Sequence, residues 1–204
     1  TTSGYGIMDY PNTGNSGEMT VKRVNISNNN FYKCRQCICI NAMSHVTINS
    51  NNSETCVNFL YLNNGSTAKC KNITVTGNTF DGTENGDMWG SLSEGRFVFG
   101  VPMTEASAIN NITITGNDII GAARHGIGLT CNQSIISNNN IYNCGGNGIY
   151  LYGGNNISCV GNNIAQYGSG FYGIKVGGNT NYQTTRAMVS SNKCDQGTIR
   201  IESN

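Results

Sequence analysis

Apolar and polar residues alternate along most of this chain, in short runs that end at a small or polar pair followed by an asparagine. Alternation with a period of two residues predicts β-strands with one buried face, and helical periodicity is absent, so we expect almost no α-helix. Seven segments share the pattern. They are residues 24–31, 46–51, 73–80, 112–119, 134–141, 157–164 and 187–194.

Superposing these segments aligns one asparagine from each, and a second short apolar strand follows every one of them. The aligned residues are Asn29, Asn51, Asn78, Asn117, Asn139, Asn162 and Asn192. A repeat of two or more short strands is typical of one coil of a parallel β-helix, in which stacked coils bury a continuous apolar column. We therefore predict an all-β parallel β-helix of about seven coils. The asparagines are expected at a turn, with left-handed backbone and amides that hydrogen-bond from coil to coil.

The segments 116–119, 126–129 and 138–141 read Gly-Asn-x-Ile, Gly-Ile-x-Leu and Asn-Asn-x-Ile. This pattern resembles the right-handed parallel β-helix superfamily, which includes pectate lyases, polygalacturonases, alginate C5-epimerases and phage tailspike depolymerases. The resemblance covers residues 20–201 and implies a single domain over 1–204 with an inserted loop at 81–108. Since both ends look uncapped, we expect a piece of a longer chain or a homotrimer that covers the terminal coils.

Composition excludes several classes of protein. Asparagine occurs 33 times, charged residues make up 11% of the chain, and the net charge is +1. There is no apolar run near the ~18 residues of a membrane span and no basic cluster for nucleic acid, so we expect neither a membrane nor a nucleic-acid partner. The expected location is a virion tail, the cell surface or the exterior of the cell.

Nine cysteines are an odd and unusually high number. Cys34-x-x-Cys37 is compatible with zinc, but no second pair of this kind and no nearby histidine pair completes a four-ligand site. We interpret the cysteines as reduced thiols that pack as small apolar residues, with no bound metal, as in a reducing interior or a virion assembled there.

The loop at 81–108 is the longest departure from the repeat, and it carries the only tryptophan. Paired carboxylates hydrolyse glycosidic bonds and aromatic faces stack on sugars. For hydrolysis we expect Asp87 and Glu94 as acid and base, Trp89 as a sugar platform and Arg96 as an anion contact. Because residues 119–193 contain no Asp or Glu, Asp118 is a further candidate for the pair. The loop oxygens leave calcium open as a cofactor, and a solvated excursion without function is the alternative.

A second candidate site is a row on the second strand of successive coils. Alternation points Gly128, Tyr150, Lys175 and Arg200 outward, stacked coil on coil. Tyr152 lies on the same face, with Arg124 and His125 at its edge. The resemblance to pectate lyases implies that this face holds the substrate, with Lys175 or Tyr150 as the base for β-elimination and His125 and Arg124 assisting. The alternative is a polar solvent face with a cation–π pair between Tyr150 and Lys175.

Three functions remain open. The first is a carbohydrate-active β-helix of tailspike type that binds and depolymerises a bacterial surface or capsular polysaccharide. The second is a non-catalytic virion-structural or adhesion rod. The third is a uronate lyase or C5-epimerase. Residues 124–127 also resemble the Gly-His-Gly motif of polygalacturonases, but the first glycine and the paired aspartates are missing.

Overall fold

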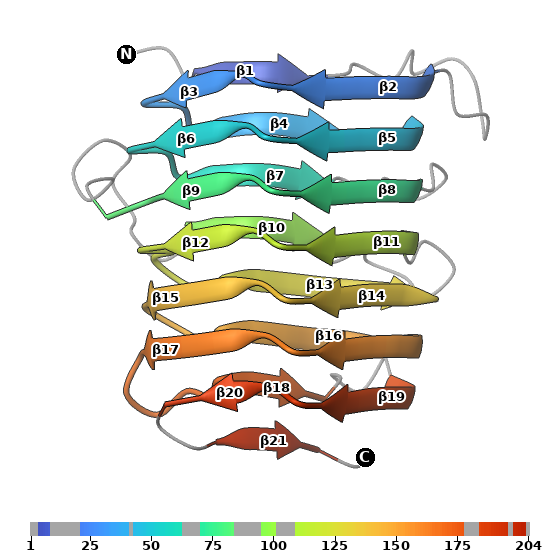
Figure 1. The fold of residues 1–204 in the computed structure, drawn as a ribbon, viewed down its shortest axis with the longest axis vertical. Helices are drawn as coiled ribbons and strands as arrows, with labels where there is room; N and C mark the ends of the chain where they lie inside the picture. The colour runs from blue at the N-terminus through green and yellow to red at the C-terminus, as the bar shows by residue number, and fades with distance from the viewer. Residues whose placement is uncertain are drawn as a thin grey trace.

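Parallel strands stack in coils along the whole described chain (Figure 1). The computed structural model describes residues 4–8, 21–40, 43–62, 70–83, 95–100, 109–177, 184–195 and 198–202. These residues form strands and turns, and every strand pairing among them is parallel. The predicted all-β parallel solenoid is confirmed.

Each coil contributes strands to three sheets, which we number 1 to 3. Sheet 1 contains β1 (Tyr5–Met8), β4 (Gln36–Ile40), β7 (Asn58–Leu62), β10 (Arg96–Gly100), β13 (Ile127–Asn132), β16 (Ile149–Val160), β18 (Ile174–Val176) and β21 (Ile199–Ile201). Sheet 2 contains β2 (Val21–Ser27), β5 (Met43–Asn49), β8 (Lys71–Thr76), β11 (Ile109–Thr115), β14 (Ser134–Ser137), the second half of β16, and β19 (Thr184–Ser190). Sheet 3 contains β3 (Asn30–Tyr32), β6 (Asn52–Glu54), β9 (Thr79–Asp81), β12 (Asp118–Ile120), β15 (Asn140–Cys144), β17 (Asn163–Tyr167) and β20 (Lys193–Cys194).

The core is a set of apolar columns inside the coils. On sheet 1 the register stacks Ile38, Leu60, Val98, Ile127, Ile149 and Ile174, all fully buried. Phe59 and Phe97 add stacked rings 4.8 Å apart on adjacent coils. One coil cannot bury such a face alone, so each coil is stabilised by its neighbours.

The predicted asparagine ladder is present between sheets 2 and 3. In each neighbouring pair the side-chain amide of one asparagine donates to the Oδ1 of the next, from Asn29 to Asn192, over 2.9–3.0 Å. The same Oδ1 atoms also accept the backbone N–H of the preceding rung. These bonds satisfy polar groups that the turn would otherwise bury unpaired.

The expected left-handed backbone falls one residue earlier than we predicted. Residues with positive φ precede the ladder asparagines, for example Asn28 (57°), Gly116 (63°) and Asn138 (53°). None of the ladder asparagines has a positive φ, and their side-chain amides donate to one another from coil to coil. The left-handed turn before each of them therefore selects Gly, Asn or Ser.

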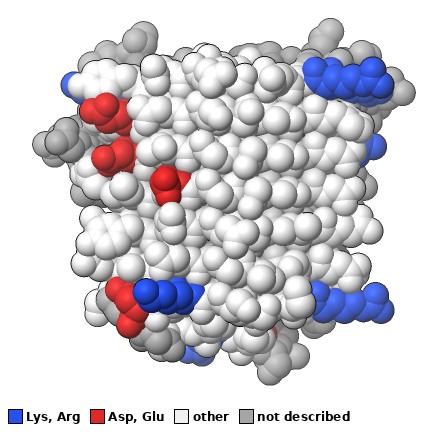
Figure 2. Space-filling view, in the orientation of Figure 1, with Lys and Arg blue, Asp and Glu red and all other residues white. Residues whose placement is uncertain are grey.

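Charge is sparse on the face formed by sheets 2 and 3, as Figure 2 shows. The outward row of sheet 2 consists of Asn25, Thr47, Thr74, Thr113, Ile135, Ser158 and Met188. Within the described residues, no helix has the length and apolar character needed to cross a membrane. All nine cysteines lie in the described part and are thiols, as predicted.

Candidate functional site

The outer face of sheet 1 carries the row predicted from the sequence. The strand register places Gly128 beside Tyr150, Tyr150 beside Lys175, and Lys175 beside Arg200. Towards the N-terminus the same row continues through Phe99 and Tyr61, whose rings stack at 5.7 Å. A stripe of aromatic and cationic side chains therefore runs along this face, across the coils.

Aromatic rings cluster at the middle of the stripe. The rings of Tyr150 and Tyr152 stack with their centroids 3.9 Å apart. The register between β13 and β16 shifts at this point, so Tyr152 is an extra residue of β16 with no partner in β13. His125 meets both rings edge-on, at 5.4 and 6.1 Å, and meets Phe171 at 6.2 Å. Gly128 provides the room, since a Cβ there would lie 3.2 Å from the Tyr152 ring. Phe171 is exposed and the two tyrosines are half-buried. Aromatic faces that remain accessible in this way stack on the apolar faces of sugar rings.

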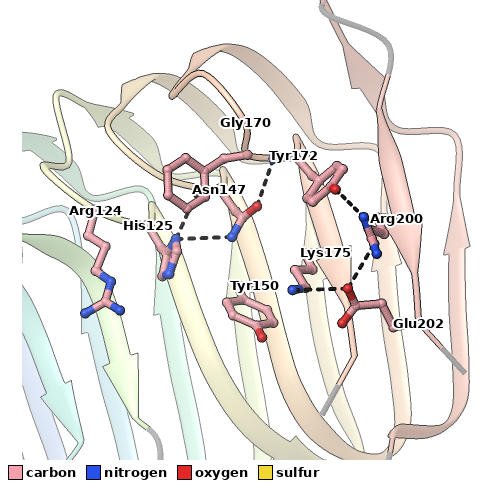
Figure 3. Close-up of a pocket in the computed structure, with 10 residues that line it drawn as sticks. Arg124, His125, Asn147, Tyr150, Gly170, Tyr172, Lys175, Arg200 and Glu202 are labelled. Atoms are coloured by element: carbon pink, nitrogen blue, oxygen red, sulfur yellow. Dashed lines mark hydrogen bonds and ion pairs between the residues drawn. The ribbon is translucent and has the colours of Figure 1, made fainter. Parts of the chain in front are cut away.

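A pocket of about 360 Å³ opens beside these rings (Figure 3). It lies over β16, β18 and β21 and the turns that precede β13, β16 and β18. Its lining consists of Arg124, His125, Asn147, Tyr150, Gly170, Phe171, Tyr172, Lys175, Arg200 and Glu202.

A hydrogen-bonded column holds one wall of the pocket. The backbone N–H of Asn147 donates to Nδ1 of His125 over 2.9 Å, and the backbone N–H of Tyr172 donates to Oδ1 of Asn147 over 2.8 Å. Because Nδ1 accepts a hydrogen bond, the neutral imidazole carries its proton on Nε2. Burial, assisted by the charges of Arg96, Arg124 and Lys175, lowers the pKa of His125 to about 3. The ring is therefore a neutral donor at physiological pH.

The opposite wall is formed by charged side chains. Lys175 Nζ lies 3.3 Å from Oε1 of Glu202, and Arg200 Nε lies 2.9 Å from the same oxygen. Arg200 also donates to the hydroxyl of Tyr172, and Lys175 lies 5.0 Å from the Tyr150 ring centroid. The predicted cation–π contact of Tyr150 and Lys175 is thus present, and two cations converge on one carboxylate oxygen (Figure 3).

Two further arginines lie close to this face. Arg96 begins β10, is 5% exposed, and stacks its guanidinium 4.0 Å from the Phe99 ring centroid. Arg124 precedes His125 and lines the pocket. Since their charges lower the pKa of His125, both contribute to a positive potential there. The structure thus brings Arg96, which we grouped with the 81–108 loop, to the stripe on sheet 1.

Of the carboxylates expected for hydrolysis, the structure describes Asp118, and it does not line this pocket. Asp118 lies on β12 in sheet 3, is exposed, and accepts a hydrogen bond from Asn140 over 2.8 Å. Asp87, Trp89 and Glu94 lie outside the described residues. Among the described residues that line the pocket, Glu202 is the one carboxylate.

Sequence reasoning missed five pocket residues: Asn147, Gly170, Phe171, Tyr172 and Glu202. Two of them had a readable signal. His125, Asn147 and Tyr172 each stand directly before a Gly-Ile pair that opens a sheet-1 strand. Aligning those pairs stacks the three residues, as the structure does. Glu202 directly follows β21, the last described strand, and aligns with Gly177 of the preceding coil, which has no side chain to suggest a carboxylate there.

A comparison with curated proteins gives no match. The family model described as the right-handed β-helix region matches residues 15–194, which is most of the chain and includes nearly all of the described coils. With the parallel coils, the three sheets and the asparagine ladder established above, the chain belongs to the right-handed β-helix family.

Proposed function

We propose that this β-helix binds an acidic polysaccharide, of the kind found on bacterial surfaces and capsules, along sheet 1 and depolymerises it by β-elimination. The observation that carries the proposal is the pocket, whose described lining combines aromatic faces with the three cations Arg124, Lys175 and Arg200 against the one carboxylate of Glu202. A uronate presents an apolar ring face and a carboxylate, and this lining complements both.

The Lys175–Glu202–Arg200 arrangement supports a carboxylate site. Oε1 of Glu202 lies where both cations can donate to one oxygen. A uronate carboxylate entering the pocket would take the same donors and displace Glu202. Bringing a cation to that carboxylate favours removal of the C5 proton, because the charge that develops in the transition state is neutralised.

In the elimination, the C5–H electron pair forms the C4=C5 double bond while the C4–O glycosidic bond breaks and the leaving oxygen takes a proton. Lys175 is ion-paired and His125 Nε2 carries a proton, so neither is suited to be the base. We assign proton transfer to Tyr150, next to Lys175 in the row: its phenolate oxygen takes the C5 proton, and the resulting hydroxyl gives that proton to the leaving O4. His125 and Arg200 then act as donors to the sugar.

The test is a screen of acidic and neutral bacterial polysaccharides that follows new reducing ends and unsaturated-uronate absorbance in parallel. We expect both signals from a uronate-containing polymer, and a loss of at least about 100-fold in rate for Tyr150→Phe. The matched control is Tyr142→Phe, an exposed tyrosine on sheet 3, which should leave the rate unchanged.

The other outcomes separate the alternatives. New reducing ends without absorbance would refute elimination and return the chemistry to the carboxylates of residues 81–108. Binding without turnover would leave a glycan-binding module. Absence of binding to every polymer would refute the proposal and favour the non-catalytic rod, which the sparsely charged face of Figure 2 supports.

A further inference from the structure

Three cysteine sulfurs meet at one corner of the first two coils. The Sγ atoms of Cys34, Cys37 and Cys56 all lie within 4.8 Å of one another. Cys34 follows β3 and Cys37 lies in β4, whereas Cys56 occupies the corresponding corner one coil later, 22 residues on from Cys34. Among the described residues, these three cysteines are the one group of His, Cys, Asp or Glu side chains whose ligand atoms lie close enough together to hold a metal ion.

We propose that these three thiols form a binding site for a thiophilic d¹⁰ cation, with Zn²⁺ as the expected ion. Zinc binds thiolate sulfur at about 2.3 Å, so the sulfurs of a tetrahedral site stand roughly 3.8 Å apart. The observed spread is within about 1 Å of that separation, which rotation of side chains can supply. Soft sulfur ligands favour such ions over Mg²⁺ or Ca²⁺.

One backbone donor already points at the cluster. The backbone N–H of Cys34 donates to the Sγ of Cys56 over 3.4 Å. Zinc binds cysteine as the thiolate, so the cation would displace the thiol protons when it binds.

Burial indicates an open coordination position. Cys37 and Cys56 are fully buried, whereas Cys34 is partly exposed. Three thiolates fix three positions, and the fourth faces solvent at the Cys34 side, where a water molecule completes a tetrahedron. A CxxC pair alone did not predict this site, because its third ligand comes from the next coil.

The site would join the first two coils of the described solenoid. β3 lies at the end of sheet 3 and pairs with β6 on one side. A cation held by Cys34 and Cys37 from one coil and Cys56 from the next would resist separation of that end coil, as metal binding contributes directly to folding stability.

The experiment uses the full chain, reduced and metal-free, titrated with Co²⁺ under anaerobic conditions and then with Zn²⁺. We expect a thiolate-to-cobalt charge-transfer band with the intense visible bands of a tetrahedral site, displaced by Zn²⁺, and a higher Tm with Zn²⁺. Cys34→Ser and Cys56→Ser should weaken Co²⁺ binding by at least about 100-fold. Cys194→Ser, which changes a partly exposed cysteine elsewhere, should bind as the parent does.

A missing charge-transfer band in the folded parent chain would overturn the proposal. So would a band that survives Cys34→Ser, or one that Cys194→Ser abolishes equally. If mass spectrometry shows that dissolved oxygen converts two of these thiols to a disulfide even in the presence of Zn²⁺, the cluster is a redox pair and not a metal site. Cys34→Ser is the decisive variant, because its side chain is partly exposed and its loss leaves the core intact.

Discussion

Replacing Asn139 by alanine tests whether the asparagine ladder stabilises the solenoid. The Asn139 amide donates to Oδ1 of Asn162 over 2.9 Å and to the carbonyl of Ile114 over 3.0 Å. Its Oδ1 accepts from the backbone N–H and the amide of Asn117, over 3.1 and 2.9 Å. A net contribution of about 1 kcal/mol for each of these buried bonds gives a loss of about 4 kcal/mol in the free energy of unfolding.

The neighbouring residue supplies the control. Asn140 is exposed, and its side-chain amide donates one exposed hydrogen bond, to Asp118. Asn140→Ala should change the free energy of unfolding by less than about 0.5 kcal/mol. The assay is urea denaturation followed by far-UV circular dichroism. If Asn139→Ala loses less than about 1 kcal/mol, or no more than Asn140→Ala, the ladder is a consequence of the coil geometry and not a source of stability.

Further predictions concern glycines, the buried histidine and the pocket carboxylate. Gly154→Ala should lower the free energy of unfolding by at least about 3 kcal/mol on urea denaturation, because φ is 134° and a Cβ would lie 1.7 Å from the carbonyl oxygen of Cys131. Gly116→Asn should leave the free energy of unfolding nearly unchanged, because Gly116 is a left-handed turn residue with open space around it. The pKa of His125 is lowered to about 3, so the unfolded chain binds the extra proton below pH 6.5 and stability falls as pH falls. Acid titration of stability should therefore show a loss of about 1.4 kcal/mol per pH unit between pH 6 and 4 that His125→Asn lacks, and equal slopes would contradict a neutral buried ring. Glu202→Gln should bind an acidic oligosaccharide more tightly by calorimetry, since it removes the carboxylate that competes for Lys175; weaker binding would show that Glu202 holds the cations in place.

The sequence predicted the asparagine ladder and the outward row because both depend only on the length of the repeat and on the alternation of residues within a strand. An asparagine that recurs once per coil must stack, and alternation places Tyr150, Lys175 and Arg200 on one face. It misplaced the left-handed residue, since Gly116 and Asn117 are both turn formers and only the backbone tells which one turns. Residues 81–108, which we expected to form an inserted loop, interrupt the sequence repeat, so no register could connect their carboxylates to the pocket.

Sites in this protein are assembled across coils, and this explains which of them local motifs can reveal. His125 and Asn147 are 22 residues apart, as are Cys34 and Cys56, and each pair is in direct contact. A motif search compares residues that are close along the chain, so it does not connect Cys34 and Cys37 with Cys56. The solenoid brings residues one repeat apart to the spacing of adjacent strands, about 4.8 Å. A search at the coil period would therefore have found Asn147 beneath His125 and Cys56 beneath Cys34. It would not have found Glu202, because the aligned positions of the two preceding coils, Gly177 and Tyr152, carry no carboxylate.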